Sequence, residues 1–304
     1  MFNGTGADIL RTYILQAIAW LYIGFVAALL SACLWFPRRR RQKIVWAGAV
    51  LLVFVVPLCL IRLEDYRISE THKARYKKAK ALFDERCKTA GEKIYKTVEN
   101  VEGVLLLEVW PRSSKSDWRD PQWSIAGLPN QRDGNDYIES FVLWERPSGS
   151  PDRGYLINTK DHARYDGDKM LPGYAFVDVK EADGFVYRYR PRVPPEFKIM
   201  GRERLSGTMA RYAISFRGIT TNPADRDQWV AGMTVLITDT KNNEVIAEKT
   251  WYSFNAGFGS RSVDISHWLF AHTCPTSANG KMRGLSPFET RFFVDQVLKP
   301  KQEN

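Results

Sequence analysis

Three arginines alternate with two tyrosines between residues 187 and 192, and this pattern carries the clearest binding chemistry in the chain. Arg188, Arg190 and Arg192 would project from one face of an extended strand, because successive side chains point to opposite sides. Guanidinium groups form paired hydrogen bonds with carboxylates and phosphates. The row therefore predicts a surface that binds an anionic ligand or an acidic protein, with a solvated strand face as the alternative.

A second group of charged residues, Asp225, Arg226 and Asp227, lies between two expected strands. Two carboxylates this close in sequence could exchange a proton or hold a hard cation. However, Asn222-Pro223 just before them is ordinary turn chemistry, and the arginine can neutralise either aspartate. We expect an ordered loop that contacts a partner, with catalysis as the alternative.

Potential metal ligands gather in one segment near the C-terminus, at Asp264, His267, His272 and Cys274. Their spacing matches neither a helical ligand pair nor a zinc-knuckle pattern. The chain also lacks the serine-hydrolase motif Gly-x-Ser-x-Gly, a glycine-rich phosphate loop, His-Glu-x-x-His and Cys-x-x-Cys. We therefore expect no metal, no cofactor and no catalytic residues, and regard an enzyme as the less favoured class.

Two uncharged, apolar runs precede all of these residues, at 12–37 and 44–61. A helix needs about 20 apolar residues to cross the hydrocarbon core of a bilayer, so both runs are long enough or nearly so. A cleaved signal peptide fits less well, because the first run is too long and a second follows it. Residues 1–61 are therefore predicted to form a transmembrane helical hairpin, whose partner is the lipid bilayer.

The connector between these runs, residues 38–43, holds five positive charges. The positive-inside rule places such a short basic loop in the cytoplasm and the C-terminal domain in the periplasm of a bacterial inner membrane. Basic residues also follow the second run closely, among them Arg62, Arg67 and Lys73. The inverted topology is therefore the alternative.

The four cysteines support the periplasmic location. Cys33 and Cys59 lie inside the apolar runs, whereas Cys87 and Cys274 are alone in the remainder of the chain. In an oxidising compartment two such thiols are expected to pair. A Cys87–Cys274 disulfide would close a very long loop and contribute on the order of 4–5 kcal/mol in the chain-entropy model. Two unrelated buried thiols are the alternative.

Residues 62–100 are predicted to form a juxtamembrane amphipathic helix that leads into the domain. Apolar residues spaced by threes and fours make one stripe along it. The stripe comprises Tyr76, Ala79, Phe83, Cys87, Ala90, Ile94 and Val98.

Residues 101–304 are predicted to form an α+β domain with a mostly antiparallel β-sheet and a C-terminal helix. Ser286 and Glu289 form a capping box for that helix, and Pro300 ends it. Strand propensity, period-two alternation and turn residues mark the sheet. The expected strands are 104–110, 137–144, 174–179, 185–190, 212–217, 230–238 and 245–254.

The net charge of +10 over 304 residues sits mainly near the membrane. Residues 1–61 carry +5, residues 62–100 carry +4, and the remaining domain carries only +1. A nucleic-acid-binding domain normally concentrates basic residues on its own surface. We therefore expect no nucleic-acid partner.

Several short motifs resemble those of uncharacterised membrane-anchored proteins of proteobacteria. They are Ala210-Arg211-Tyr212, the stretch 225–232, the stretch 243–248, Cys274-Pro275 and the stretch 297–300. The resemblance implies a bacterial protein that faces the cell envelope, and it brings no assigned chemistry.

The sequence thus predicts an inner-membrane-anchored protein with a periplasmic, non-enzymatic domain that binds a protein or an envelope ligand. A narrower hypothesis is an immunity-type inhibitor of a toxin that acts in the periplasm. The alternatives are an envelope hydrolase that uses Asp225, Asp227 or the histidines near Cys274, and a cytoplasmic lipid or nucleic-acid binder of inverted topology.

Overall fold

The chain divides into two compact units, residues 1–74 and 75–304. The computed structural model describes residues 6–35, 39–110, 122–148, 154–156, 170–191, 200–219, 222–259, 267–268, 270–275 and 286–301. Arg192 and Asp264 lie outside the described residues.

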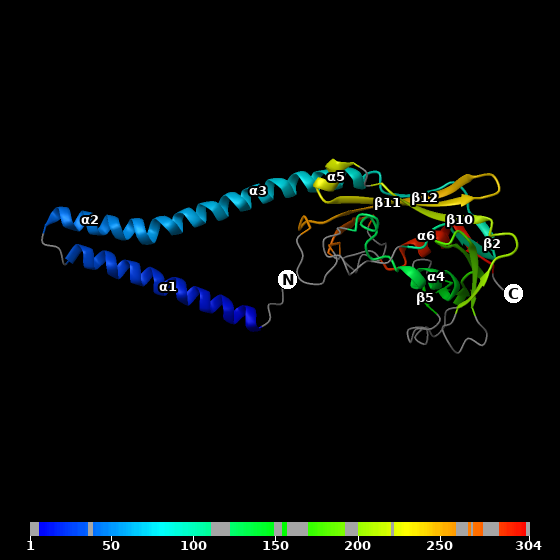
Figure 1. Cartoon of the computed structure of the whole chain (residues 1–304), viewed down its shortest axis with the longest axis horizontal. Coiled ribbons are helices and arrows are strands. Elements are labelled where there is room, and N and C mark those ends of the chain that lie inside the picture. Colours follow the sequence, from blue (N-terminus) through cyan, green and yellow to red (C-terminus); the bar gives the residue numbers. More distant parts are fainter. Residues whose placement is uncertain are drawn as a thin grey trace. The chain divides into compact units, whose positions relative to one another are not determined.

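The first unit contains the two apolar segments (Figure 1). Helix α1 (Gly6–Trp35) is followed by a continuous helical run of α2 (Arg40–Val50), a π-helical turn η1 (Leu51–Val55) and the start of α3 (Val56–Cys87). The π turn lies just before Pro57, which lacks the N–H that a regular helix donates four residues back. By length and composition, both α1 and the run from Arg40 are able to cross a membrane.

Helix α3 ends at Cys87, so the prediction of a helix up to residue 100 is wrong. Gly91 has φ +118°, a conformation that side chains disfavour, and the chain there enters β1 (Gly91–Ile94) and then β2 (Val98–Val101). Ile94 pairs with Ala247 in the large sheet. The apolar spacing of this segment fits a helix by coincidence, whereas its β-branched residues serve strand pairing.

The second unit is built on a nine-stranded sheet of order β1-β12-β11-β10-β3-β7-β8-β9, with β13 paired to β12. Strand β3 is parallel to both of its neighbours, and the other pairs are antiparallel. The sheet is therefore mixed. The strands are β3 (Gly103–Leu106), β7 (Phe176–Lys180), β8 (Val186–Pro191), β9 (Met200–Arg204), β10 (Tyr212–Gly218), β11 (Val230–Asp239), β12 (Glu244–Phe254) and β13 (His272–Cys274).

Two small sheets accompany the large one. Strand β14 (Leu298–Pro300) runs parallel to β2, and β4 (Trp144–Pro147) lies between β5 (Tyr155–Leu156) and β6 (Met170–Pro172). A pocket is lined by residues of β2, β14, β4 and β6.

The segment predicted as a strand at 137–144 is instead helix α4 (Gly134–Val142) followed by β4. Its aromatic and β-branched residues suggest a strand, but Tyr137, Ile138, Phe141 and Val142 fall on one helical stripe and are all buried. Tertiary burial of this stripe outweighs local strand propensity.

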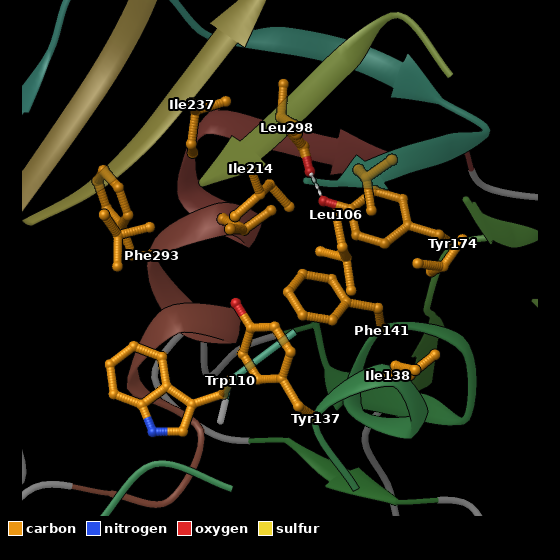
Figure 2. Close-up of a cluster of buried hydrophobic side chains, with 14 of the residues drawn as sticks. Leu106, Trp110, Tyr137, Ile138, Phe141, Tyr174, Ile214, Ile237, Phe293 and Leu298 are labelled. Carbon is orange, nitrogen blue, oxygen red and sulfur yellow. Dashed lines mark hydrogen bonds between the residues drawn. The ribbon is translucent and has the colours of Figure 1, made fainter. Parts of the chain in front are cut away.

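The predicted C-terminal helix is confirmed as α6 (Glu289–Val297). Half of the expected capping box is present, because the backbone N–H of Ser286 donates to Glu289 Oε1 at 3.1 Å. Phe293 of α6 and Phe141 of α4 pack with Ile214 and Ile237 of the sheet in one core (Figure 2).

This core also encloses a complete ion pair within α6. Arg291 Nη1 lies 2.6 Å from Asp295 Oδ1, and both side chains are buried. The guanidinium carbon of Arg291 is 4.5 Å from the ring centroid of Tyr174 and 5.3 Å from that of Phe141. The aromatic rings stabilise the cation where water is excluded.

Replacing Arg291 by methionine should strongly destabilise the second unit. The change leaves Asp295 buried without the cation that it contacts, which costs about 3–5 kcal/mol. Urea unfolding of the full chain in lipid nanodiscs, followed by tryptophan fluorescence, measures the loss. Arg132→Met removes the exposed pair with Asp136 and should unfold at nearly the wild-type urea concentration. Equal midpoints for the two variants would contradict this view of the core.

Candidate functional site

Arg188, the first member of the predicted arginine row, is engaged inside the sheet. Its Nε and Nη2 donate to the two carboxylate oxygens of Asp178 on β7, at 2.7 and 2.8 Å. Asp178 is fully buried, and the Arg188 side chain is only 14% exposed. This hydrogen bonding raises the pKa of Arg188, and the pair joins β7 to β8.

Arg190, the next member of the row, is the more accessible of the two. Its side chain is 53% exposed, and its Nε is 3.9 Å from Glu203 Oε1 on β9. Both arginines approach the ring of Phe176, whereas Tyr189 between them is buried in the core. The predicted alternation therefore holds over residues 187–190, and of the two described arginines of the row Arg190 is the one that a ligand can reach.

Strand β9 adds two arginines that sequence reasoning missed. The guanidinium carbon of Arg202 lies 3.7 Å from the ring centroid of Tyr187, and that of Arg204 lies 3.5 Å from the ring centroid of Phe185. The charged residues Arg202, Glu203 and Arg204 follow one another in the sequence, and charged side chains are typical of an edge strand. This local pattern could have predicted β9. We call Phe185, Tyr187, Arg202 and Arg204, which lie on one face of the sheet, together with Arg190 on the other face, the arginine–aromatic edge.

Glu181 fixes the position of Arg202 on this edge. Arg202 donates to both carboxylate oxygens of Glu181, at 2.9 and 2.6 Å, and the hydroxyl of Tyr189 donates to Oε1 at 2.6 Å. The guanidinium holds the pKa of Glu181 below its ordinary value. Burial and, to a smaller extent, the hydrogen bond to Glu181 raise the pKa of Tyr189 to about 12.

Arg204 is held differently, by its aromatic neighbour. Within the part of the chain that the structure describes, it forms no ion pair, and its guanidinium stacks on the Phe185 ring. A stacked guanidinium keeps its N–H groups directed outward. Arg190 and Arg204 can therefore offer hydrogen bonds to carboxylates on an approaching molecule.

The group at residues 225–227 serves a structural role. Helix α5 (Pro223–Asp227) begins at Asn222, whose side chain accepts a hydrogen bond from the N–H of Ala224 at 2.9 Å. Asp225 is buried and pairs with Arg86 Nη2 at 3.1 Å, which raises the pKa of Arg86. Asp227 is exposed, and its backbone carbonyl accepts from Arg75 at 2.9 Å.

The rest of this group also contributes to packing. Arg226 lies 5.5 Å from the ring centroid of Trp123. Asp225 thus pairs with the end of α3 while Asp227 remains in solvent, so the two carboxylates have different surroundings and different partners. This arrangement favours a fixed junction over acid–base chemistry.

The junction is completed by the disulfide predicted from the sequence. Cys87 at the end of α3 is bonded to Cys274 on β13, with 5.8 Å between their Cα atoms. Tyr76 and Phe83 of α3 each place their rings 5.8 Å from that of Phe254. We call this disulfide, these ring contacts and the pairs made by Arg75 and Arg86 the α3 clamp.

The histidines near Cys274 take part in aromatic packing. His272 stacks on Phe254 with 6.0 Å between ring centroids, and His267 lies 5.4 Å from Trp229. No group of three or more histidine, cysteine, aspartate or glutamate side chains among the described residues is arranged to hold a metal ion.

No known protein family, curated protein or solved structure matches this chain.

The pairing of Glu181 with Arg202 predicts an acid-sensitive edge. A carboxylate whose pKa is lowered by folding stabilises the folded state above its ordinary pKa of 4.5, and this contribution is lost as pH falls. Urea midpoints of the wild type should therefore drop between about pH 5 and pH 3.

Glu181→Gln should lower the midpoint at neutral pH and make this acid-induced drop smaller. Glu108→Gln removes an exposed carboxylate elsewhere in the chain and provides the control. If Glu181→Gln and Glu108→Gln show the same pH profile, the pair does not stabilise the edge.

Proposed function

We propose that this protein is an inner-membrane-anchored binding protein whose α+β domain lies in the periplasm. In this proposal the domain recognises an acidic segment of a partner protein through the arginine–aromatic edge. Anchoring is supported by two helices that are apolar and long enough to span a bilayer.

The Cys87–Cys274 disulfide is the single observation that carries the location. Disulfides persist in oxidising compartments and are rare in a reducing cytoplasm. The basic connector at residues 38–43 favours the same topology, because it would remain on the cytoplasmic side. Both arguments support a periplasmic domain for a bacterial inner-membrane protein.

The composition and exposure of the arginine–aromatic edge support the binding role. Arginine and tyrosine are over-represented among residues that dominate the energy of protein interfaces. Arg202 is already oriented by Glu181 and Arg204 by Phe185, so binding would order few additional side chains. Within the described chain β9 pairs only with β8, which leaves one side of its backbone open to a partner.

Acidic partners fit this edge because two of its arginines, Arg190 and Arg204, lack a short ion pair among the described residues. Arg190 has a carboxylate oxygen no closer than 3.9 Å among the described residues, and Arg204 is stacked on a ring. An immunity-type inhibitor of a toxin that acts in the periplasm is one form of this proposal, since a tethered antagonist would meet the toxin there.

Photo-crosslinking in living cells tests the partner surface. A photoreactive phenylalanine analogue in place of Tyr187 should form a discrete protein adduct on irradiation. Reversing the charge with Arg190→Glu and Arg204→Glu should reduce the adduct about tenfold, because the buried or close charge pairs of an interface become repulsive.

Arg217→Glu, on the exposed surface of β10, is the matched control and should leave the adduct unchanged. A tryptophan fluorescence spectrum and a urea midpoint close to those of the wild type show that each purified variant is folded. No adduct, or an adduct insensitive to the charge reversal, would refute the proposed surface.

A further inference from the structure

A pocket of about 260 Å³ opens between the two small sheets of the domain. One wall comes from β2 and β14 and presents Glu99, Asn100 and Lys299. The other comes from β4 and β6, where Arg146 and Leu171 are cross-strand partners. The volume is slightly below the usual range of ligand pockets and suits a small metabolite.

Hydrogen bonds from the core hold the two walls together. The hydroxyl of Tyr174, just after β6, donates to the backbone carbonyl of Leu298 on β14 at 2.6 Å (Figure 2). The backbone N–H of Ala175 donates to the carbonyl of Glu102, next to β2, at 2.8 Å. The pocket is therefore formed by the packed domain itself, which reduces the cost of ordering it around a ligand.

Among the described residues around the pocket, Arg146 is the cation without an ion pair. Lys299 Nζ pairs with Glu99 Oε1 at 2.7 Å, so these two neutralise each other. Arg146 forms no ion pair within the described ranges, and its positive charge acts on Asp295, which already pairs with Arg291. Burial raises the pKa of Asp295, although both guanidinium groups act to lower it. Arg146, Arg291 and Asp295 together therefore carry a net positive charge whether or not Asp295 is ionised.

Asn100 lies at an irregularity of the backbone in the lining of the pocket. It has φ +59°, in the left-handed region, and it lies where the register of β2 against β14 shifts between Leu298 and Pro300. Asparagine adopts this conformation more readily than most non-glycine residues. Here the irregularity brings an amide, which can donate two hydrogen bonds, to the lining of the pocket.

We propose that this pocket binds a small organic anion through Arg146. The guanidinium forms paired hydrogen bonds with a carboxylate or phosphate group, and the amide of Asn100 donates to the same group. The carbon skeleton of the ligand lies against Leu171, Pro172 and Pro300. The site shares no residue with the arginine–aromatic edge, so it is independent of the proposed partner recognition.

Calorimetric titration of the full chain in nanodiscs tests this site, with succinate and inorganic phosphate as probes. At least one probe should bind saturably with a Kd below about 1 mM. Arg146→Gln should weaken binding about tenfold or more, since it removes a charged hydrogen-bond donor. Arg217→Gln, which removes an exposed arginine outside the pocket, should keep the wild-type Kd.

Asn100→Gly is a second test that does not depend on the folding of the arginine variant. Glycine accepts the left-handed conformation, so this change removes only the amide and should weaken binding several-fold. Succinate binding assigns a carboxylate ligand, and phosphate binding assigns a phosphoryl ligand. The site is refuted if neither probe binds up to about 10 mM, or if both pocket variants keep the wild-type Kd.

Discussion

The α3 clamp fixes the helix that follows the second apolar segment to the β-sheet of the domain. The disulfide joins residues 187 positions apart, and in the chain-entropy model such a closure contributes on the order of 5 kcal/mol. Around it, Arg86 pairs with buried Asp225, and Phe83 packs on Phe254. Because disulfides are rare in reducing compartments, this covalent part of the clamp is expected in an oxidising environment.

Arginine serves two distinct purposes in this domain, and burial separates them. Arg188 and Arg291 are buried or nearly so, and each lies against its own carboxylate and an aromatic ring. Losing either carboxylate would leave an uncompensated charge, so these pairs specify the packing. Arg146 and Arg204 form no ion pair among the described residues, and Arg190 has only a long contact of 3.9 Å with Glu203, so these are the cations most available to external anions.

Sequence reasoning succeeded where the signal is local. Counting cysteines outside the apolar runs predicts the Cys87–Cys274 bond, and period-two alternation locates most strands of the large sheet. It failed where tertiary context decides. The segment that forms α4 is rich in aromatic and β-branched residues, which are typical of strands, although its apolar residues also lie on one side of a helix. Strand β3 pairs in parallel with β7 and β10, and parallel pairing requires long connections whose end points no local pattern predicts.

The candidate sites show the same limit. The arginine row is visible in the sequence, but Asp178 as the partner of Arg188 follows only from the register of β7 against β8. The pocket combines residues from Glu99 to Pro300, which no local motif connects. Its one local clue is Asn100, because asparagine tolerates the left-handed conformation better than most residues.

The oxidation state of Cys87 and Cys274 in living cells tests the central claim most directly. Cells producing the full chain with Cys33→Ala and Cys59→Ala are quenched with acid and treated with a maleimide polymer under denaturing conditions, with and without prior reduction. A periplasmic domain predicts no mass shift without reduction and a shift by two polymers after it, whereas Cys87→Ser should leave one reactive thiol. Two reactive thiols in the unreduced sample would place the domain in the cytoplasm and contradict the account.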